Sequence, residues 1–148
     1  FDGAVDNPSV KELTIASLIS TRPYASADCD LSVAITRVPR TQAGLVARVD
    51  DPANPQNFIV VFWDGVGNVR LYKRVAGTWT QNMILGAVTY ADGRILRLVC
   101  SGNNVSVYYN GTQVGSTTAV ADAGIVGNKN HGLFATYAAN TFTEYTAA

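Results

Sequence analysis

The sequence has few charged residues and no excess of either sign. Lysine plus arginine number 11 and aspartate plus glutamate number 11, so the formal net charge is zero; charged residues make up 15% of the 148-residue chain. A basic stripe interleaved with aromatic residues, typical of nucleic-acid-binding domains, is missing, and we expect no nucleic-acid partner. The length fits a single domain, residues 1–148, that can bury its own core.

Long apolar runs are also missing. No stretch approaches the roughly 20 apolar residues that a membrane-spanning helix needs, so we expect no membrane insertion. No signal peptide is visible. The chain starts at Phe1 rather than Met, which indicates that it is processed, trimmed or cut from something longer.

Cysteine is scarce, since Cys29 and Cys100 are the two that the chain contains. A disulfide scaffold would need more of them in a shorter chain. Both lie in stretches of alternating apolar residues, which leaves two interpretations open. They are buried thiols that pack as small hydrophobic groups, or they form a disulfide that joins two strands.

Alternation of apolar and polar residues dominates the rest of the chain. It is clearest over residues 96–100 and 105–109, which flank a polar tip. The dipeptide Asn110-Gly111 follows, and it favours a type I′ hairpin turn, in which both central residues need positive φ. A period of two predicts strands rather than helices.

Other segments have the same character. We expect further strands over residues 28–38, 44–49, 58–63, 69–75, 79–85, 114–120, 132–137 and 141–146, with a less regular one over 11–19. Residues 58–63 are apolar on both faces, which predicts a central strand that is covered on both sides or lines a groove. Ten to twelve strands at short spacing, without a convincing helix, predict an all-β sandwich or barrel. Residues 1–25 are poorly defined.

The order and spacing of these segments resemble the concanavalin A-like lectin/glucanase superfamily, above all its LamG-like jelly-roll domains. The matching segments are 44–48, 57–62, 69–73, 97–103, 105–111, 124–127 and 142–145, and the resemblance is strongest over 28–148. It implies a two-sheet antiparallel jelly-roll β-sandwich. Many members bind sugars, while others are structural or adhesive modules, including modules of viral and phage particles.

A catalytic site has little support. The glucanases that the chain resembles carry clustered acidic residues of the pattern Glu-x-Asp-x-Glu. This chain has two glutamates, Glu12 and Glu144, far apart and outside such a pattern. Asp28 and Asp30 are expected to be solvated carboxylates, and His131, the single histidine, is expected to cap a turn or contact solvent. We therefore predict that the protein is not an enzyme.

Two turn regions contain oxygen ligands of the kind that Ca²⁺ prefers. Asp50 and Asp51 precede a loop rich in proline and asparagine, and Asp64 precedes a glycine-rich turn. Turn formation explains the same residues without a metal. The sequence thus requires no cofactor and leaves Ca²⁺ as an alternative.

Sugar binding needs an aromatic plane for the apolar face of the ring, and amides or guanidinium groups for its hydroxyls. Arg70, Tyr72 and Arg74 are expected on one outward face, and Tyr108 is also expected to point outward. Trp63 completes the candidate set, although core or groove-edge packing is the favoured interpretation of this residue, as it is of Trp79. The alternative for the whole face is an ordinary solvated sheet.

Two asparagines, Asn104 and Asn110, fit the N-glycosylation triplet, which we interpret as turn chemistry. The sequence as a whole predicts a non-catalytic recognition or adhesion module that binds glycans, at an extracellular, cell-surface or virion location. The first alternative is a structural virion component. It would be a phage decoration, fibre or tail-associated domain held by protein–protein contacts, as a homo-oligomer such as a trimer or a larger assembly. The second is a glycoside hydrolase-like domain.

Overall fold

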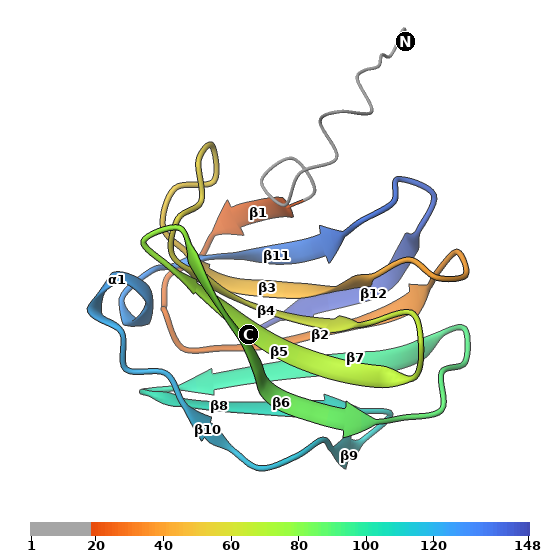
Figure 1. Cartoon of the computed structure of the whole chain (residues 1–148). Helices are drawn as coiled ribbons and strands as arrows, with labels where there is room; N and C mark the ends of the chain where they lie inside the picture. Colours follow the sequence, from red (N-terminus) through yellow and green to blue (C-terminus); the bar gives the residue numbers. More distant parts are fainter. Residues whose placement is uncertain (1–18) are drawn as a thin grey trace, which may run out of the picture.

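Two antiparallel sheets pack face to face, as Figure 1 shows for the computed structural model, which describes residues 19–148 apart from the side chains at positions 81, 82 and 85. Sheet A contains, in spatial order, β1 (Ile19–Pro23), β11 (Asn130–Ala135), β3 (Ala43–Val49), β4 (Phe58–Trp63), β5 (Asn68–Val75) and β6 (Thr78–Ala87). Sheet B contains β10 (Thr118–Ala119), β8 (Asn104–Tyr109), β7 (Arg94–Ser101), β2 (Cys29–Thr36) and β12 (Thr141–Ala147), with β9 (Thr112–Gln113) also paired to β8. The predicted two-sheet antiparallel sandwich is confirmed.

Two of the strand pairs in sheet B, β2–β7 and β2–β12, join strands that are distant in sequence. Strand β2 lies between β7 and β12, and the register places Leu31 opposite both Leu98 and Ala147. In sheet A, β3 to β6 follow one another along the chain, whereas β11 inserts between β1 and β3. This exchange of distant strands is what distinguishes a jelly roll from a simple meander.

The core lies between the sheets because every second side chain on each strand points inward. In sheet A, Leu45, Val61 and Leu71 lie opposite one another across β3, β4 and β5, and all three are fully buried. In sheet B, Leu98 and Val107 lie opposite each other on β7 and β8, and both are fully buried. The alternation read from the sequence therefore identifies the inner faces correctly.

Three local expectations are refined, need correction or fall outside the described residues. Residues 114–120 are expected to form a short strand or an extended piece, and the structure has the two-residue strand β10 in this range, after Gly115 adopts a φ of 67°. A single helical turn, α1 (Ala123–Val126), occupies a region where no helix was expected. The expected strand over 11–19 lies almost entirely before the described residues.

Strand β4 is central, as expected, and all six of its residues are buried. Its inward side chains meet the main core, while Phe58, Val60 and Phe62 point to the opposite, outer face of sheet A. An outer sheet face with buried aromatic side chains is unusual for a half-solvated sheet. The surface above those side chains is therefore a candidate binding face.

Candidate ligand-binding face

A second hydrophobic cluster lies on the outer face of sheet A, separate from the core between the sheets. Its buried members are Val46, Val49, Phe58, Val60, Phe62 and Phe134. The partly buried side chains of Ile19, Tyr72 and Trp79 pack against them. The cluster forms a rigid apolar base for the residues at the surface.

Tyr72 and Trp79 stand on this base with defined ring geometry. The Tyr72 ring meets Phe62 edge-on at a centroid distance of 5.1 Å, and Trp79 meets Phe58 edge-on at 5.5 Å. The Tyr72 and Trp79 centroids are 6.2 Å apart. Such edge-to-face pairs hold the rings in fixed orientations and add about 0.5–1.5 kcal/mol each beyond area burial.

Two arginines complete this surface, which we call the arginine–aromatic patch (Arg70, Tyr72, Arg74 and Trp79). The Arg74 guanidinium lies 5.7 Å from the Trp79 ring centroid and donates hydrogen bonds to the carbonyl oxygens of Gly77 and Pro55, each at 3.1 Å. Because carbonyl oxygens carry no full charge, these contacts do not neutralise the Arg74 guanidinium, and the patch keeps its positive charge. Arg70 instead forms an ion pair with Asp64, with Nε 2.6 Å from Oδ2.

The register of one hairpin brings Trp79 into the patch. Ala76 and Gly77 both have positive φ, at 48° and 81°, as in a two-residue type I′ turn. This turn places Arg74 opposite Trp79. The favoured interpretation of Trp79 from the sequence was core or groove-edge packing. The two-residue spacing between residues 75 and 78 nevertheless indicated the hairpin that aligns Trp79 with Arg74.

Asp64, one of the candidate calcium ligands, is committed to the turn between β4 and β5. Its Oδ1 accepts hydrogen bonds from the backbone N–H groups of Val66, Gly67 and Asn68, and its Oδ2 accepts from the Asn68 amide and Arg70. Burial alone would raise the pKa of this carboxyl, but the Val66 N–H and Arg70 hydrogen bonds outweigh it and lower the pKa to about 2. The carboxylate has no free acceptor position left for a metal ion.

Asp50 and Asp51 lie beyond the opposite end of β4, so the structure does not bring them together with Asp64. Asp50 accepts hydrogen bonds from the Gln56 N–H and the Asn57 amide, and Asp51 accepts one from the Ala53 N–H. These are turn-stabilising contacts. Within residues 19–148, no group of three His, Cys, Asp or Glu side chains is arranged to hold a metal ion.

The five residues that the sequence singled out for glycan binding occupy three different places. Arg70, Tyr72 and Arg74 share the outer face of sheet A. Trp63 is 3% exposed and packs in the core between the sheets, so it presents no face to a ligand and is not part of the candidate site. Tyr108 points outward from sheet B, on the opposite side of the sandwich, where Arg97 lies 5.1 Å from its ring centroid.

The two cysteines lie directly opposite each other on β2 and β7, and both thiols are free and buried. A hydrogen bond to the Cys100 thiol and burial together raise the pKa of Cys29. The thiols therefore pack as small hydrophobic groups in the structure. Opposed Cα positions in neighbouring strands are also within the span of a disulfide, which keeps the second interpretation open.

His131 corrects one expectation, because it is fully buried rather than solvent-exposed. It lies in β11 beside a register shift against β3, where its Nδ1 accepts a hydrogen bond from the Arg48 N–H at 3.1 Å. That contact assigns the ring proton to Nε2, which lies 3.0 Å from the Ser26 carbonyl oxygen. A histidine whose two nitrogens are bound to the backbone in this way is structural.

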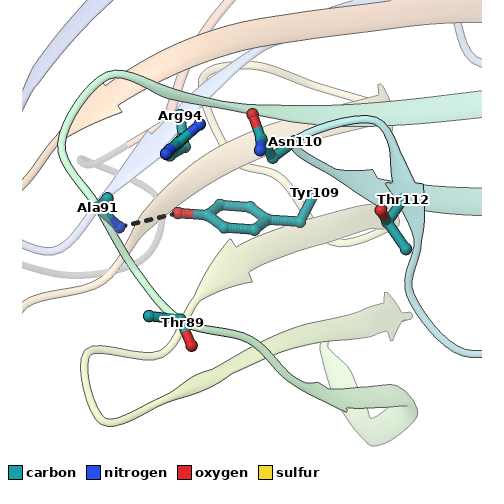
Figure 2. A pocket seen from close by; sticks show the side chains of 6 residues that line it. All are labelled: Thr89, Ala91, Arg94, Tyr109, Asn110 and Thr112. Carbon is teal, nitrogen blue, oxygen red and sulfur yellow. Dashed lines mark hydrogen bonds between the residues drawn. The ribbon is translucent and has the colours of Figure 1, made fainter.

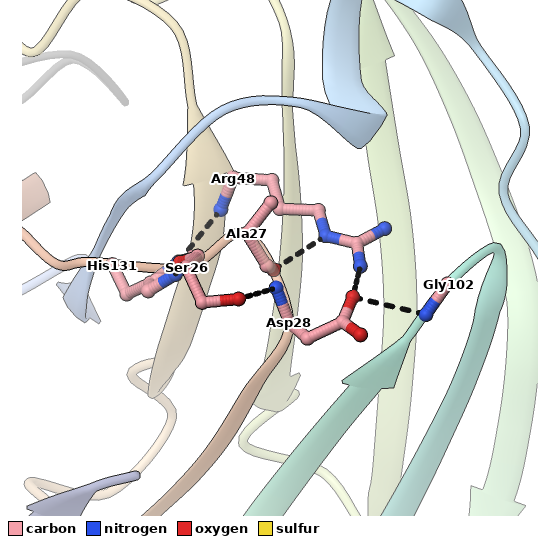
Figure 3. A network of polar contacts seen from close by, with 6 residues as sticks. All are labelled: Ser26, Ala27, Asp28, Arg48, Gly102 and His131. Atoms are coloured by element: carbon pink, nitrogen blue, oxygen red, sulfur yellow. Dashed lines mark hydrogen bonds and ion pairs between the residues drawn. The ribbon is translucent and has the colours of Figure 1, made fainter.

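The same network holds a buried arginine that the sequence did not reveal (Figure 3). Arg48 has a φ of 57° and donates from Nε to the Ala27 carbonyl oxygen at 2.9 Å and from one terminal nitrogen to Asp28 at 3.0 Å. Asp28 also accepts the Gly102 N–H at 2.9 Å. An arginine within an otherwise apolar strand was the available signal. Asp28 is its partner, and the Asp28 side chain is 57% exposed, so it is also solvated as expected.

Comparisons with known proteins give no match to a family model. Curated protein sequences give no match either. Solved structures do match. The chain is similar to the carbohydrate-binding module CBM66 from Bacillus subtilis, at 15% identity and a TM-score of 0.63, over 86% of this chain and 76% of that one.

Two further structures show the same arrangement. Sheep galectin-11 in complex with glycerol is 10% identical, with a TM-score of 0.65 over 88% of this chain and 96% of that one. Xylan β-1,4-xylosidase from Bacillus halodurans is 13% identical, with a TM-score of 0.58 over 87% of this chain and 29% of that one. The chain has the concanavalin A-like jelly-roll fold. The resemblance read from the sequence is thereby confirmed.

The concanavalin A-like sandwich described here contains no helix that is long and apolar enough to cross a membrane, within residues 19–148. Its acidic side chains are also dispersed. Asp28, Asp30 and Asp122 pair with Arg48, Arg97 and Lys73 respectively, and Glu144 is exposed on β12.

Proposed function

We propose that this protein is a non-catalytic glycan-recognition module that acts outside the cell and binds a saccharide on the arginine–aromatic patch. The observation that carries the proposal is the pair of rings of Tyr72 and Trp79, held edge-on against a buried aromatic base. A sugar ring presents an apolar C–H face that stacks on such rings. A binding surface that is ordered before the ligand arrives loses less conformational entropy on binding.

The arginines supply the polar part of the same surface. The Arg74 guanidinium has five N–H donors and is fixed by two carbonyl oxygens, which leaves further donors for ligand hydroxyls. Arg70 is oriented by Asp64 in the same way. Aromatic planes beside oriented donors are what a saccharide requires.

The fold comparisons support this proposal at the level of architecture. CBM66 is named as a carbohydrate-binding module, and a galectin is a lectin, whereas the xylosidase match covers 29% of an enzyme chain. The same fold can serve many functions, so these likenesses set the class of proposal and the patch gives its site. Four of the described carboxylates, those of Asp28, Asp30, Asp64 and Asp122, are paired with arginine or lysine, which supports binding without catalysis.

A glycan array with matched variants tests the proposal. Tyr72→Ala removes one ring of the patch, while Tyr108→Ala removes an outward tyrosine from the opposite sheet. We expect Tyr72→Ala to weaken binding to the recognised glycan class by about tenfold or more, since aromatic contacts each contribute about 1 kcal/mol and the neighbouring rings lose support. Tyr108→Ala should leave binding within twofold, by rough estimate for a residue remote from the site.

Equal losses in both variants would contradict the assignment to sheet A. Binding that survives Tyr72→Ala unchanged would place the glycan elsewhere. Absence of binding across a broad array would remove glycan recognition and favour the structural-particle role, which measurement of the oligomeric state by light scattering would then test.

Tryptophan fluorescence gives a second readout, since the chain has two tryptophans, Trp63 and Trp79. Trp63 is in the core, and Trp79 is at the patch. Addition of the bound glycan should change the emission of the wild-type protein and of Trp63→Phe. In Trp79→Phe the change should be lost, and its persistence would argue against the patch.

A further inference from the structure

A small cavity opens at one end of the sandwich, where the loop between β6 and β7 meets the turn between β8 and β9 (Figure 2). Its volume is about 250 Å³, and its lining consists of Thr89, Ala91, Arg94, Tyr109, Asn110 and Thr112. None of these residues belongs to the arginine–aromatic patch. The cavity is therefore a feature independent of the proposed glycan face.

Four of the five polar side chains of this lining are exposed to solvent and have no protein partner within the described part of the chain. Arg94, Asn110 and the threonines at 89 and 112 make no side-chain hydrogen bond or ion pair to any residue of 19–148. The Tyr109 hydroxyl accepts the Ala91 N–H at 3.3 Å, and its own proton has no acceptor there. By contrast, other arginines have carboxylate partners: Arg48, Arg70 and Arg97.

A buried tryptophan supports the cavity wall from behind. The Trp63 side chain is almost completely buried and is not part of the cavity lining. Its indole nitrogen lies beside the Tyr109 hydroxyl, so the tyrosine ring that forms one wall of the cavity rests against the core.

The walls of the cavity are held in place by the backbone. Tyr109 is 7% exposed, and the Asn110 N–H donates to the Ile95 carbonyl oxygen at 2.8 Å. Asn110 and Gly111 have φ values of 50° and 85°, as in a type I′ turn, so the Asn110 side chain projects from a fixed point. The free polar groups are therefore on rigid supports, which favours specific binding.

The charge and size of the cavity define the ligand class. Arg94 is its one charged lining residue, and the neighbouring carboxylate, Asp92, already accepts a hydrogen bond from the Tyr90 hydroxyl at 2.6 Å. A guanidinium without a carboxylate partner matches a ligand carboxylate in bidentate geometry, and the amide and hydroxyl groups match ligand hydroxyls. The volume lies below the roughly 300–1,000 Å³ of pockets for drug-sized ligands, which suits one sugar ring.

We propose that this end cavity is a second binding site, specific for an acidic monosaccharide unit, with the Arg94 guanidinium on the carboxylate of a hexuronate and Asn110, Thr89 and Thr112 on its hydroxyls. The site stands on its own geometry and does not depend on the arginine–aromatic patch. If both sites are occupied, the module recognises a polysaccharide that contains uronate residues.

An NMR titration tests the cavity directly, using methyl β-D-glucuronide as the probe and methyl β-D-glucoside as its neutral match. We expect saturable shifts of the Ala91 and Asn110 amide signals with the glucuronide and shifts at least about fivefold smaller with the glucoside, because a charge-assisted hydrogen bond exceeds a neutral one. Arg94→Gln replaces an exposed guanidinium by a shorter, uncharged polar side chain and should weaken glucuronide binding roughly tenfold or more.

Two control variants separate this site from the rest of the molecule. Arg22→Gln removes an exposed arginine of edge strand β1 and should leave glucuronide affinity unchanged, as should Tyr72→Ala in the patch. The proposal is overturned by equal responses to the two glycosides, by lack of saturation, or by an unaffected Arg94→Gln. Loss of the response in Tyr72→Ala would also overturn it, because the glucuronide would then bind the patch.

Discussion

The two outer faces of the sandwich are built from strands with the same alternation, yet they differ in what lies beneath the surface. On sheet A, the outward side chains of β4 are Phe58, Val60 and Phe62, and they are buried in a cluster that supports the arginine–aromatic patch. On sheet B, the outward side chains pair with one another at the surface. Ser32 and Thr146 hydroxyls are 2.7 Å apart, and Arg97 binds Asp30 through two hydrogen bonds.

This difference shows which face is organised for a ligand. The polar groups of sheet B satisfy one another across adjacent strands, which is the ordinary way to stabilise a solvated face. The aromatic groups of sheet A form a supported plane next to Arg74, whose guanidinium has donors beyond the two bound to carbonyl oxygens. A face that needs no partner and a face prepared for one thus occur on opposite sides of one domain.

The largest expected difference between the faces concerns the stability of the fold. Phe62→Ala would leave a cavity in the outer cluster, because Phe62 is buried against Tyr72 and Phe134. We expect a loss of about 3–5 kcal/mol in the free energy of unfolding, as for other buried phenylalanines. Urea denaturation followed by circular dichroism measures it.

The matched control for this prediction is Tyr108→Ala on sheet B. Tyr108 is partly exposed, and its main contact is with Arg97, so we expect a loss of about 1 kcal/mol. Similar losses for the two variants would show that the outer cluster of sheet A contributes no more than an ordinary surface pair.

Acid should separate the two faces through Asp64 and Asp30. The pKa of Asp64 is about 2 in the folded protein against an ordinary value of 3.8, so its stabilising contribution is complete above about pH 4 and disappears as the pH falls through 2. That shift corresponds to about 2 kcal/mol. Asp64→Asn should remove most of this pH dependence, measured as unfolding free energy between pH 5 and about 2.

Asp30 provides the comparison on sheet B. Its hydrogen bond with Arg97 lowers its pKa as well, but the two side chains are 40% and 45% exposed, so solvent screens the interaction. Asp30→Asn should therefore change the acid sensitivity less than Asp64→Asn. A larger effect at Asp30 would contradict the view that burial on the sheet A side governs the acid response.

Features that depend on neighbouring residues could be predicted from the sequence, whereas features that depend on contacts between distant segments could not. Alternation is local, so the inner faces, the central position of residues 58–63 and the jelly-roll class were all predictable. The sheet to which a strand belongs is set by distant pairing, such as β2 with β12. Tyr72 and Tyr108 therefore looked equivalent in sequence although they lie on opposite sides of the molecule.

Two other features depend on geometry that residue types do not encode. The glycine- and asparagine-rich segment around His131 suggested a residue that caps a turn or contacts solvent. The ring is instead buried, at the register shift between β11 and β3. The end cavity joins residues from two separate segments, 89–94 and 109–112, and the sequence pattern of neither segment indicates it. In contrast, the two-residue hairpin spacing that aligns Arg74 with Trp79 could be predicted from the sequence.

The smallest expected effect is the coupling between Asp30 and Arg97, and it is the most direct comparison of the two faces. A double-mutant cycle with Asp30→Asn and Arg97→Gln should give a coupling below about 1 kcal/mol that decreases further in 1 M salt, as for exposed ion pairs. The Asp64–Arg70 pair has the same N–O separation of 2.6 Å, but its side chains are 4% and 23% exposed. A cycle with Asp64→Asn and Arg70→Gln should therefore give the larger coupling and the weaker salt dependence. Because the Asp30–Arg97 pair is bidentate, a larger coupling between Asp64 and Arg70 would reflect the lower exposure of that pair rather than a better contact. Equal couplings would mean that the outer face of sheet A is as open to water as that of sheet B, and the case for a pre-organised binding face there would fail.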